Sequence, residues 1–167
     1  VMGISELDEL QKMRSQIEDV GGRFTEIGRS ADGLWPLYKI SFGSLDKSKP
    51  ALGIIGGVHG LERIGAQVAV EFLKTYVHFL SWNSPYRRQL QDIRVFFIPA
   101  VNPSGLYAKT RGNSQGIDLM RNSPTAAEKA AFLVGGHRYA PWLPWYRGES
   151  LAAESKALIA GVEEELS

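Results

Sequence analysis

The sequence contains no cysteine and only three histidines among its 167 residues. The absence of cysteine excludes disulfide bonds, thiolate metal sites and cysteine nucleophiles, and it fits either a reducing or an oxidising compartment. An excess of charge is lacking as well. The formal net charge is +1, so neither nucleic acid nor an anionic membrane surface is expected as a partner.

Long apolar runs are also missing. No stretch reaches the roughly 18 apolar residues that a transmembrane segment needs. The first ten residues, VMGISELDEL, do not place an apolar segment after a basic one, so no signal peptide is visible in this chain. The localisation therefore stays open between a cytoplasmic and a secreted or periplasmic protein, and the oligomeric state stays open too.

What is present fits a single globular domain over residues 1–167, long enough to bury a substantial core. A helix is predicted from Ser5, with Asp8 placed to complete a capping box, and it ends at the glycine pair 21–22. Four apolar residues recur along this helix at helical spacing and predict one buried stripe: Leu7, Leu10, Met13 and Ile17.

Strands and helices then alternate. Residues 23–44 predict two strands joined by a turn at Asp32 and Gly33, and ALGIIGGV (51–58) predicts a strand covered on both faces. A helix follows over about 62–80, with a second buried strand at IRVFFIPAV (93–101). The apolar residues of that helix expected to face the sheet are Ile64, Val68, Phe72 and Tyr76, with Leu73 and Leu80 beside them. The expected fold is a three-layer α/β/α sandwich with a mixed, mostly parallel sheet.

The chain after Val101 is mostly loop, because it is rich in Gly, Asn, Ser and Pro up to about residue 124. A short helix is predicted over 125–133, and Ser150 is predicted to cap a last helix that runs to Leu166. The aromatic segment PWLPWYRG (141–148) has two readings. We favour a packed loop that covers a pocket or an edge over a platform that stacks on a ligand.

A histidine and a glutamate stand at the end of the first buried strand, in GIIGGVHGLERIGA (53–66). Ligands of open α/β sheets bind at the carboxyl ends of strands, and His59 and Glu62 are placed there, across a strand-to-helix turn. Imidazole and carboxylate together are part of many catalytic zinc sites. On spacing alone, however, such a pair is more often a hydrogen-bonded or solvated one.

Further motifs follow in order. GGVHGLERIGAQVAVEFL, then FFIPAVNPSGLYAKTRGNSQGIDLMRN, resembles the zinc carboxypeptidase family, the funnelin-type metallocarboxypeptidases. That family has a strand leading into His-x-x-Glu, then an Asn-Pro-Asp-Gly-like loop, an arginine and a Gly-Val-Asp-Leu-Asn-Arg-Asn segment. The corresponding segments here are 59–62, 102–105, Arg111 and 116–122, and the resemblance runs over most of the chain.

The resemblance implies a zinc-dependent hydrolase of peptide or amide bonds. It assigns zinc to His59 and Glu62, transition-state stabilisation to Arg111, and the terminal carboxylate of a substrate to Arg121. A fork-shaped guanidinium suits that carboxylate better than a lysine would. Asn113 is expected to support the loop or to contact the substrate.

The match fails at two points. Met120 stands where the family has an asparagine, so one donor to a terminal carboxylate is missing. This is either a tolerated change, or a sign of a substrate such as a cell-wall peptide or an acylated amino acid. The family's third zinc ligand and its general-base glutamate would come after Ser167, so we expect the chain to be an N-terminal part that is inactive alone. His137 is a weak candidate for the third ligand, and His78 is expected to face solvent.

Two alternatives to a peptidase remain. One is a deacylase of N-acyl amino acids, which shares the His-x-x-Glu plan. The other is a non-catalytic fragment or pseudoenzyme that keeps the fold without a complete site.

Overall fold

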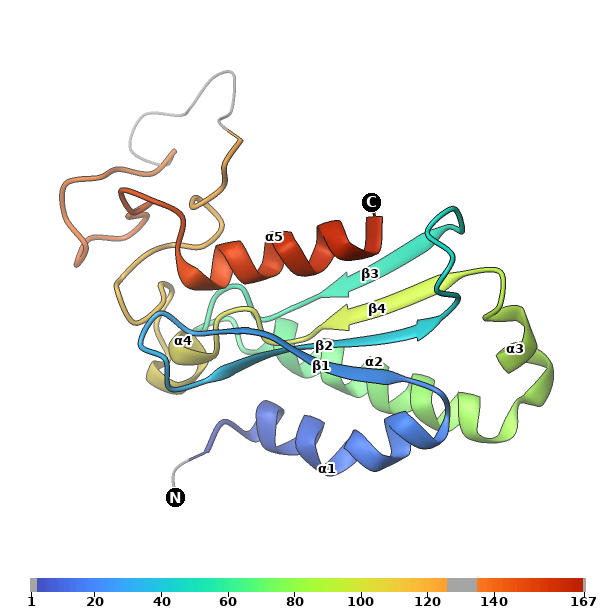
Figure 1. Ribbon diagram of the computed structural model, residues 1–167. Coiled ribbons are helices and arrows are strands. Elements are labelled where there is room, and N and C mark those ends of the chain that lie inside the picture. Colours follow the sequence, from blue (N-terminus) through green and yellow to red (C-terminus); the bar gives the residue numbers. More distant parts are fainter. Residues whose placement is uncertain (1–2, 126–134, 167) are drawn as a thin grey trace.

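The computed structural model describes residues 3–125 and 135–166. Within them, one four-stranded sheet has the strand order β1-β2-β4-β3. Its strands are β1 (Arg23–Arg29), β2 (Pro36–Gly43), β3 (Ala51–Ile55) and β4 (Arg94–Ile98). The helices are α1 (Ser5–Asp19), α2 (Ile64–Trp82), α3 (Ser84–Gln89), α4 (Pro103–Ala108) and α5 (Ala153–Leu166). Helices α1 and α2 lie on one face of the sheet, and α5 lies on the other (Figure 1).

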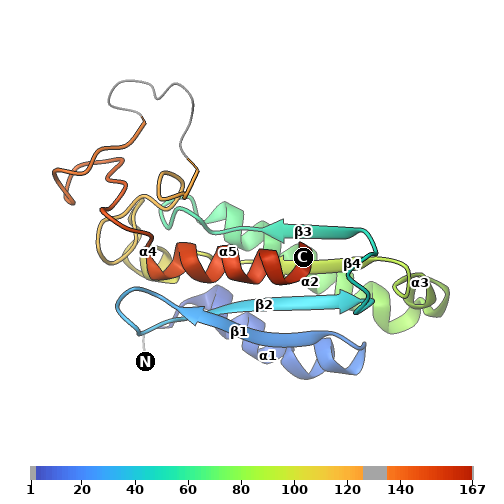
Figure 2. The ribbon, with the colours of Figure 1, turned by 45° about the horizontal axis from the view of Figure 1, so that its top comes forward.

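The predicted three-layer α/β/α arrangement is therefore confirmed, and Figure 2 shows the strands side by side between the two helical layers. The sheet is mixed, but the described part is not mostly parallel. Strand β3 pairs parallel with β4, whereas β1 with β2 and β2 with β4 pair antiparallel. The short connection at Asp32 and Gly33 explains why β1 and β2 are antiparallel, since a hairpin joins antiparallel strands. Gly33 has a φ of +72° in this turn.

Helix α1 buries the predicted stripe of Leu7, Leu10, Met13 and Ile17. The predicted capping box is wrong. Ile4 precedes the helix, and no side chain caps its first turn. The Ser5 hydroxyl instead donates to Glu6, whose buried carboxylate collects donors from elsewhere in the fold.

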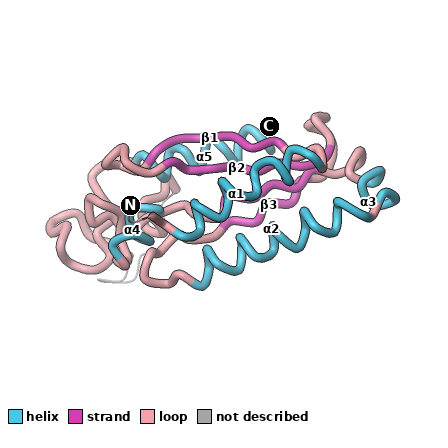
Figure 3. The backbone as a smooth tube through the Cα atoms, turned by 90° about the horizontal axis from the view of Figure 1, so that it is seen from below, coloured by secondary structure: helices cyan, strands magenta, loops and turns pink. Residues whose placement is uncertain are grey.

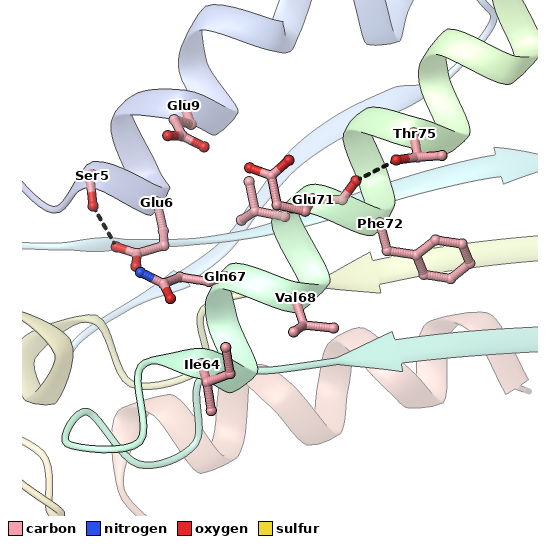
Figure 4. Close-up of a pocket in the computed structure, with 10 residues that line it drawn as sticks. Ser5, Glu6, Glu9, Ile64, Gln67, Val68, Glu71, Phe72 and Thr75 are labelled. Carbon is pink, nitrogen blue, oxygen red and sulfur yellow. Dashed lines mark hydrogen bonds between the residues drawn. The ribbon is translucent and has the colours of Figure 1, made fainter.

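The face that helix α2 packs on the sheet overlaps with the predicted one in part. Figure 3 shows it running beside α1 under the sheet. Tyr76, Leu73 and Leu80 are buried as expected, together with Ala66, Ala69, Val70 and Val77. Ile64, Val68 and Phe72 are exposed, and Figure 4 shows them along one outer side of the helix. The alanines explain the difference, because small side chains allow the helix to lie close to the strands.

Strand β3 is also less covered than its apolar sequence indicates. It forms an edge of the described sheet, and Leu52 and Ile55 are exposed. Strand β4, the second strand predicted to be buried, has all of its residues buried. Periodicity cannot distinguish these two apolar strands, since the difference depends on which strand has neighbours on both sides.

Helix α5 begins at Ala153, so Ser150 is not its cap. It is fixed to the sheet by Lys39, whose ammonium lies 2.9 Å from Glu165 and 2.7 Å from Glu164. The helix predicted over 125–133 lies, apart from its first residue, outside the described residues. The segment 141–148 is irregular, as predicted, and α4 is a short helix inside the stretch predicted as loop.

No helix in residues 3–125 and 135–166 is both long and apolar enough to cross a bilayer.

Candidate functional site

The turn between β3 and α2 carries His59 and Glu62. The Nδ1 atom of His59 lies 3.4 Å from Oε1 of Glu62. The His59 side chain is buried and that of Glu62 is half exposed. The pair is therefore reachable from solvent through Glu62, while His59 is held in place by its surroundings. The amide of Glu62 donates to the carbonyl of His59, which closes the turn.

Glycine at position 60 allows this turn to pack against α4. A Cβ atom there would lie 1.8 Å from the carbonyl carbon of Gly105, so a larger residue would displace one of the two segments. Asn102 ties the ends of the two parallel strands together. Its amide group donates to the carbonyl of Val58, while its side-chain oxygen accepts from the amide of Gly105.

Asp118 is the centre of the cluster, a role that sequence reasoning did not assign to it. Its Oδ1 lies 3.0 Å from Nε2 of His59, and its Oδ2 accepts from Nε of Arg111 at 2.8 Å and from Nη1 of Arg121 at 3.0 Å. Burial alone would raise the pKa of Asp118. Hydrogen bonds from Arg111 and His59, and the charges of Arg111 and Arg121, outweigh it and hold this pKa below its usual value. The sequence did contain a signal for this role, because Asp118 lies between Arg111 and Arg121 in the same polar stretch.

The His59 and Glu62 atoms suit a zinc ion. Two ligand atoms bound at 2.0–2.1 Å with a tetrahedral angle lie about 3.3 Å apart, close to the 3.4 Å between Nδ1 and Oε1. The other ring nitrogen of His59 contacts Asp118, as expected of a ligating histidine held by a carboxylate. Among residues 3–125 and 135–166, no group of three or more His, Asp, Glu or Cys residues is arranged to hold a metal ion.

Arg111 lies beside this pair, with Nη1 3.2 Å from Oε1 of Glu62. Arg121 approaches the same cluster through Asp118, and the Met120 side chain is exposed. Asn113 is buried, and its side chain donates to Glu154 and accepts from the amides of Gln115 and Ile117. These contacts hold the loop, while substrate contacts by Asn113, Met120 and Arg121 stay predictions.

The other two histidines have other surroundings. His78 is exposed on α2, as predicted. The ring of His137 stacks on Tyr139, and its Nε2 lies 2.9 Å from the carbonyl oxygen of Pro144. The spacing of residues 112–116 also matches the Gly-x-Ser-x-Gly motif of serine hydrolases. Ser114 lies in a turn without the strand-to-helix setting of that motif, so it carries no such role.

Known proteins share both the sequence pattern and the fold. The family model described as zinc carboxypeptidase matches residues 5–165. The catalytic chain of carboxypeptidase N from Rattus norvegicus is 30% identical over 132 residues, covering 69% of this chain and 28% of that protein. Carboxypeptidase Z from Mus musculus is 28% identical over 159 residues, covering 82% of this chain and 24% of that protein.

Two solved structures show the same fold. Bovine thrombin-activatable fibrinolysis inhibitor, solved with a tick carboxypeptidase inhibitor, superposes with a TM-score of 0.73 at 19% identity, covering 99% of this chain and 56% of that one. Carboxypeptidase A from Helicoverpa armigera gives a TM-score of 0.73 at 17% identity, covering 99% and 43%. The chain spans about a quarter of the length of the curated relatives it matches. On the evidence of its motifs, its fold and the match over residues 5–165, the chain belongs to the zinc carboxypeptidase family.

Proposed function

We propose that the chain contributes the N-terminal part of a zinc-dependent hydrolase of peptide or amide bonds, in which His59 and Glu62 bind the zinc. The observation that carries the proposal is that His59 and Arg111 both lie beside the carboxylate of Glu62. Nδ1 of His59 and Nη1 of Arg111 lie 3.4 Å and 3.2 Å from the same oxygen of Glu62. A metal-ligand pair with a cation beside it supplies part of what zinc-dependent hydrolysis of a carbonyl compound requires.

Bound zinc would supply a polarised scissile carbonyl and an activated water, the nucleophile. The residues of this chain would orient the metal ligand and stabilise the charge that develops on the substrate. Asp118 contacts Nε2 of His59, which leaves Nδ1 facing Glu62. Arg111 is placed to donate hydrogen bonds to the carbonyl oxygen as negative charge develops on it. The family resemblance assigns Arg121 to the terminal carboxylate of a substrate, for which a planar guanidinium offers two parallel donors, and Met120 argues against that assignment in this chain.

The experiment is a calorimetric zinc titration of the chain and of His59→Ala. We expect weak binding by the chain, because two protein ligands leave the remaining positions to water, and a loss of binding in the variant. His78→Ala is the matched control, since His78 is exposed on α2. Binding that persists in His59→Ala, or that falls equally in His78→Ala, would remove His59 from the metal site.

The position of Met120 bears on the substrate. Its side chain is 61% exposed and has no donor, and Arg121 is already bonded to Asp118. We therefore favour a substrate with its anionic group elsewhere, such as a cell-wall peptide or an acylated amino acid. The test compares a short peptide, its C-terminal amide and a cell-wall tripeptide, in an active protein that contains this chain. Activity confined to the peptide with a free carboxylate would refute the assignment. Met120→Asn should improve the use of that peptide.

Two alternatives to a peptidase each rest on a specific observation. A deacylase of N-acyl amino acids would use the same ligand pair and Arg111, and the acylated substrate in the same assay would reveal it. A non-catalytic role of the 167-residue chain alone stays the second alternative, since its described residues place only His59 and Glu62 as a ligand pair. Zinc binding without hydrolysis of any of these substrates by a longer protein would favour that role.

A further inference from the structure

Glu154 is a carboxylate that the proposed function does not use, although it is completely buried. It lies in the first turn of α5 and is 0% exposed. Its Oε1 accepts from the amide of Ala31 at 2.8 Å, and its Oε2 accepts from Nδ2 of Asn113 at 2.9 Å. Within the part of the chain that the structure describes, these are its only polar contacts, and no cation pairs with it. Glutamate is almost never fully buried without a cation, so its two contacts deserve an explanation beyond packing.

The position of Glu154 in α5 makes this burial tolerable. The first turn of a helix carries the positive end of the helix dipole, which favours a negative charge. Figure 1 shows the start of α5 at the end of the sheet where β3 and β4 end, beside the loops that carry the candidate site. The carboxylate is therefore held at the level of the site, while its own contacts are with the loops around it.

Asn113 connects this carboxylate to a closed turn. Its Oδ1 accepts from the amides of Gln115 and Ile117, both at 3.0 Å, and its own amide donates to the carbonyl of Ile117 at 2.9 Å. Gly116 completes the turn with a φ of +75°. Asn113 can direct Oδ1 at the turn only while Nδ2 points the other way, toward Glu154. The carboxylate therefore fixes which way the Asn113 amide group faces.

This turn brings together the two partners of the central ion pair. Arg111 comes two residues before Asn113, and Asp118 directly follows Ile117. Nε of Arg111 donates to Oδ2 of Asp118 at 2.8 Å, and Oδ1 of the same carboxylate lies 3.0 Å from Nε2 of His59. A change in the turn would therefore move both the cation and the carboxylate that contacts His59.

We propose that Glu154 is a positioning residue of the candidate site. Through Asn113 it fixes the turn 113–117, and this turn aligns Asp118 with the side chains bonded to it. A carboxylate suits this task because its oxygens only accept hydrogen bonds, so Asn113 has one stable orientation. The consequence for zinc binding rests on the proposed function, whereas the consequence for the turn does not.

The test exchanges donor and acceptor between the two side chains. Glu154→Gln keeps the size of the side chain, but its amide nitrogen would face either the Ala31 amide or Nδ2 of Asn113, and both are donors. Asn113→Asp fails for the opposite reason, because two carboxylates would then face each other. In the double variant the amide of residue 154 donates to the carboxylate of residue 113, and the other bonds of both residues are kept. Each single change should therefore impair the site, and the double variant should restore it.

The first readout needs no metal. The Nε–H proton of Arg111 gives an NMR signal whose exchange with water is slow while it donates to Asp118. We expect this exchange to become about tenfold faster in each single variant, the size expected for the loss of one hydrogen bond. In the double variant the rate should return to within about twofold of that in the unchanged chain.

The second readout is the zinc dissociation constant from a competition titration with a chelator. It should rise about tenfold in each single variant, the low end for groups that support a metal ligand, and recover in the double variant. Unchanged zinc affinity together with faster exchange would overturn the proposal, because the alignment of Asp118 would then not matter to the site. Circular dichroism checks that each variant is folded. Should Glu154→Gln not fold, Asn113→Asp and the double variant provide the same comparison.

Glu165→Gln is the matched control, because Glu165 is a second buried acid on α5 and contacts Lys39 and Ser41 instead of the turn. It should lower stability without changing either readout. An equal change in Glu165→Gln, an unchanged Arg111 exchange rate in Glu154→Gln, or a double variant that stays impaired would each overturn the proposal. The zinc titration of His59→Ala tests the proposed function separately. If that test failed, the metal-free exchange rate of Arg111 would still decide whether Glu154 positions the turn.

Discussion

Replacing Glu6 with glutamine tests how much the ion pair between α1 and Arg63, the residue after Glu62, stabilises the fold. Glu6 is 2% exposed, and its carboxylate accepts three hydrogen bonds. Oε1 accepts from Nε of Arg63 at 2.6 Å, and Oε2 accepts from Nη2 of Arg63 at 2.7 Å and from the Ser5 hydroxyl at 3.1 Å. Arg63 directly follows Glu62, so this pair links α1 to the start of α2.

Glutamine has the size of glutamate but offers one acceptor oxygen, and its amide nitrogen would face the donors now bonded to Oε2. A hydrogen bond to a charged group contributes about 1.5–3 kcal/mol. Arg63 is one-third exposed, so part of its charge is solvated and the lower half of that range applies. We expect Glu6→Gln to lower the free energy of unfolding by about 2 kcal/mol, or the melting temperature by about 4–8 °C in a domain of this size.

The assay is urea denaturation followed by circular dichroism. Glu9→Gln is the matched control, because Glu9 lies on the same helix in a partly exposed pair with Lys74 and should cost less than about 1 kcal/mol. A loss for Glu6→Gln no larger than that for Glu9→Gln would refute the reasoning.

The same variant has an expected pH dependence. Burial would raise the pKa of Glu6, but the hydrogen bonds from Arg63 and from the backbone outweigh it and lower this pKa below 4.5. A carboxylate with a lowered pKa in the folded state stabilises the fold above its unfolded pKa, and this stabilisation is lost as the pH falls through the folded value. The stability difference between the chain and Glu6→Gln should therefore be constant above about pH 5 and shrink below about pH 4.5. A difference that does not shrink would show that the charge of Glu6 is not its source.

Three further outcomes follow from the structure. Asp118→Asn should weaken zinc binding about 10- to 100-fold in a competition titration, because it disturbs the contact that orients His59; unchanged affinity would show that the contact has no such role. Lys39→Met should lower the free energy of unfolding by about 3 kcal/mol in urea, since it leaves the buried Glu165 carboxylate without its cation; a neutral result would mean that this carboxylate is solvated. Leu73→Ala should cost about 2–5 kcal/mol and Val68→Ala less than about 0.5 kcal/mol, which tests the buried face of α2; a reversed order would mean that the helix is rotated.

The layered α/β fold and the location of the candidate site could be predicted from the sequence. Two continuous apolar runs, 51–58 and 93–101, predicted strands, and the periodic apolar residues between them predicted a helix. The polar residues after each strand could then be placed at one edge of the sheet. His59 and Glu62 were found in this way, and Arg111 through the family resemblance. The structure places Nδ1 of His59 and Nη1 of Arg111 3.4 Å and 3.2 Å from Oε1 of Glu62.

The residues that support the candidate site, and the described apolar surfaces that stay exposed, could not be predicted from the sequence because they depend on how the elements pack. The exposure of Ile64 and Val68 depends on how closely two alanines let α2 approach the sheet, and hydrophobic periodicity does not report that distance. Asp118 acquires its role because His59, 59 residues earlier in the chain, meets the same carboxylate as Arg111 and Arg121. The contact with His59 exists only once the chain has folded.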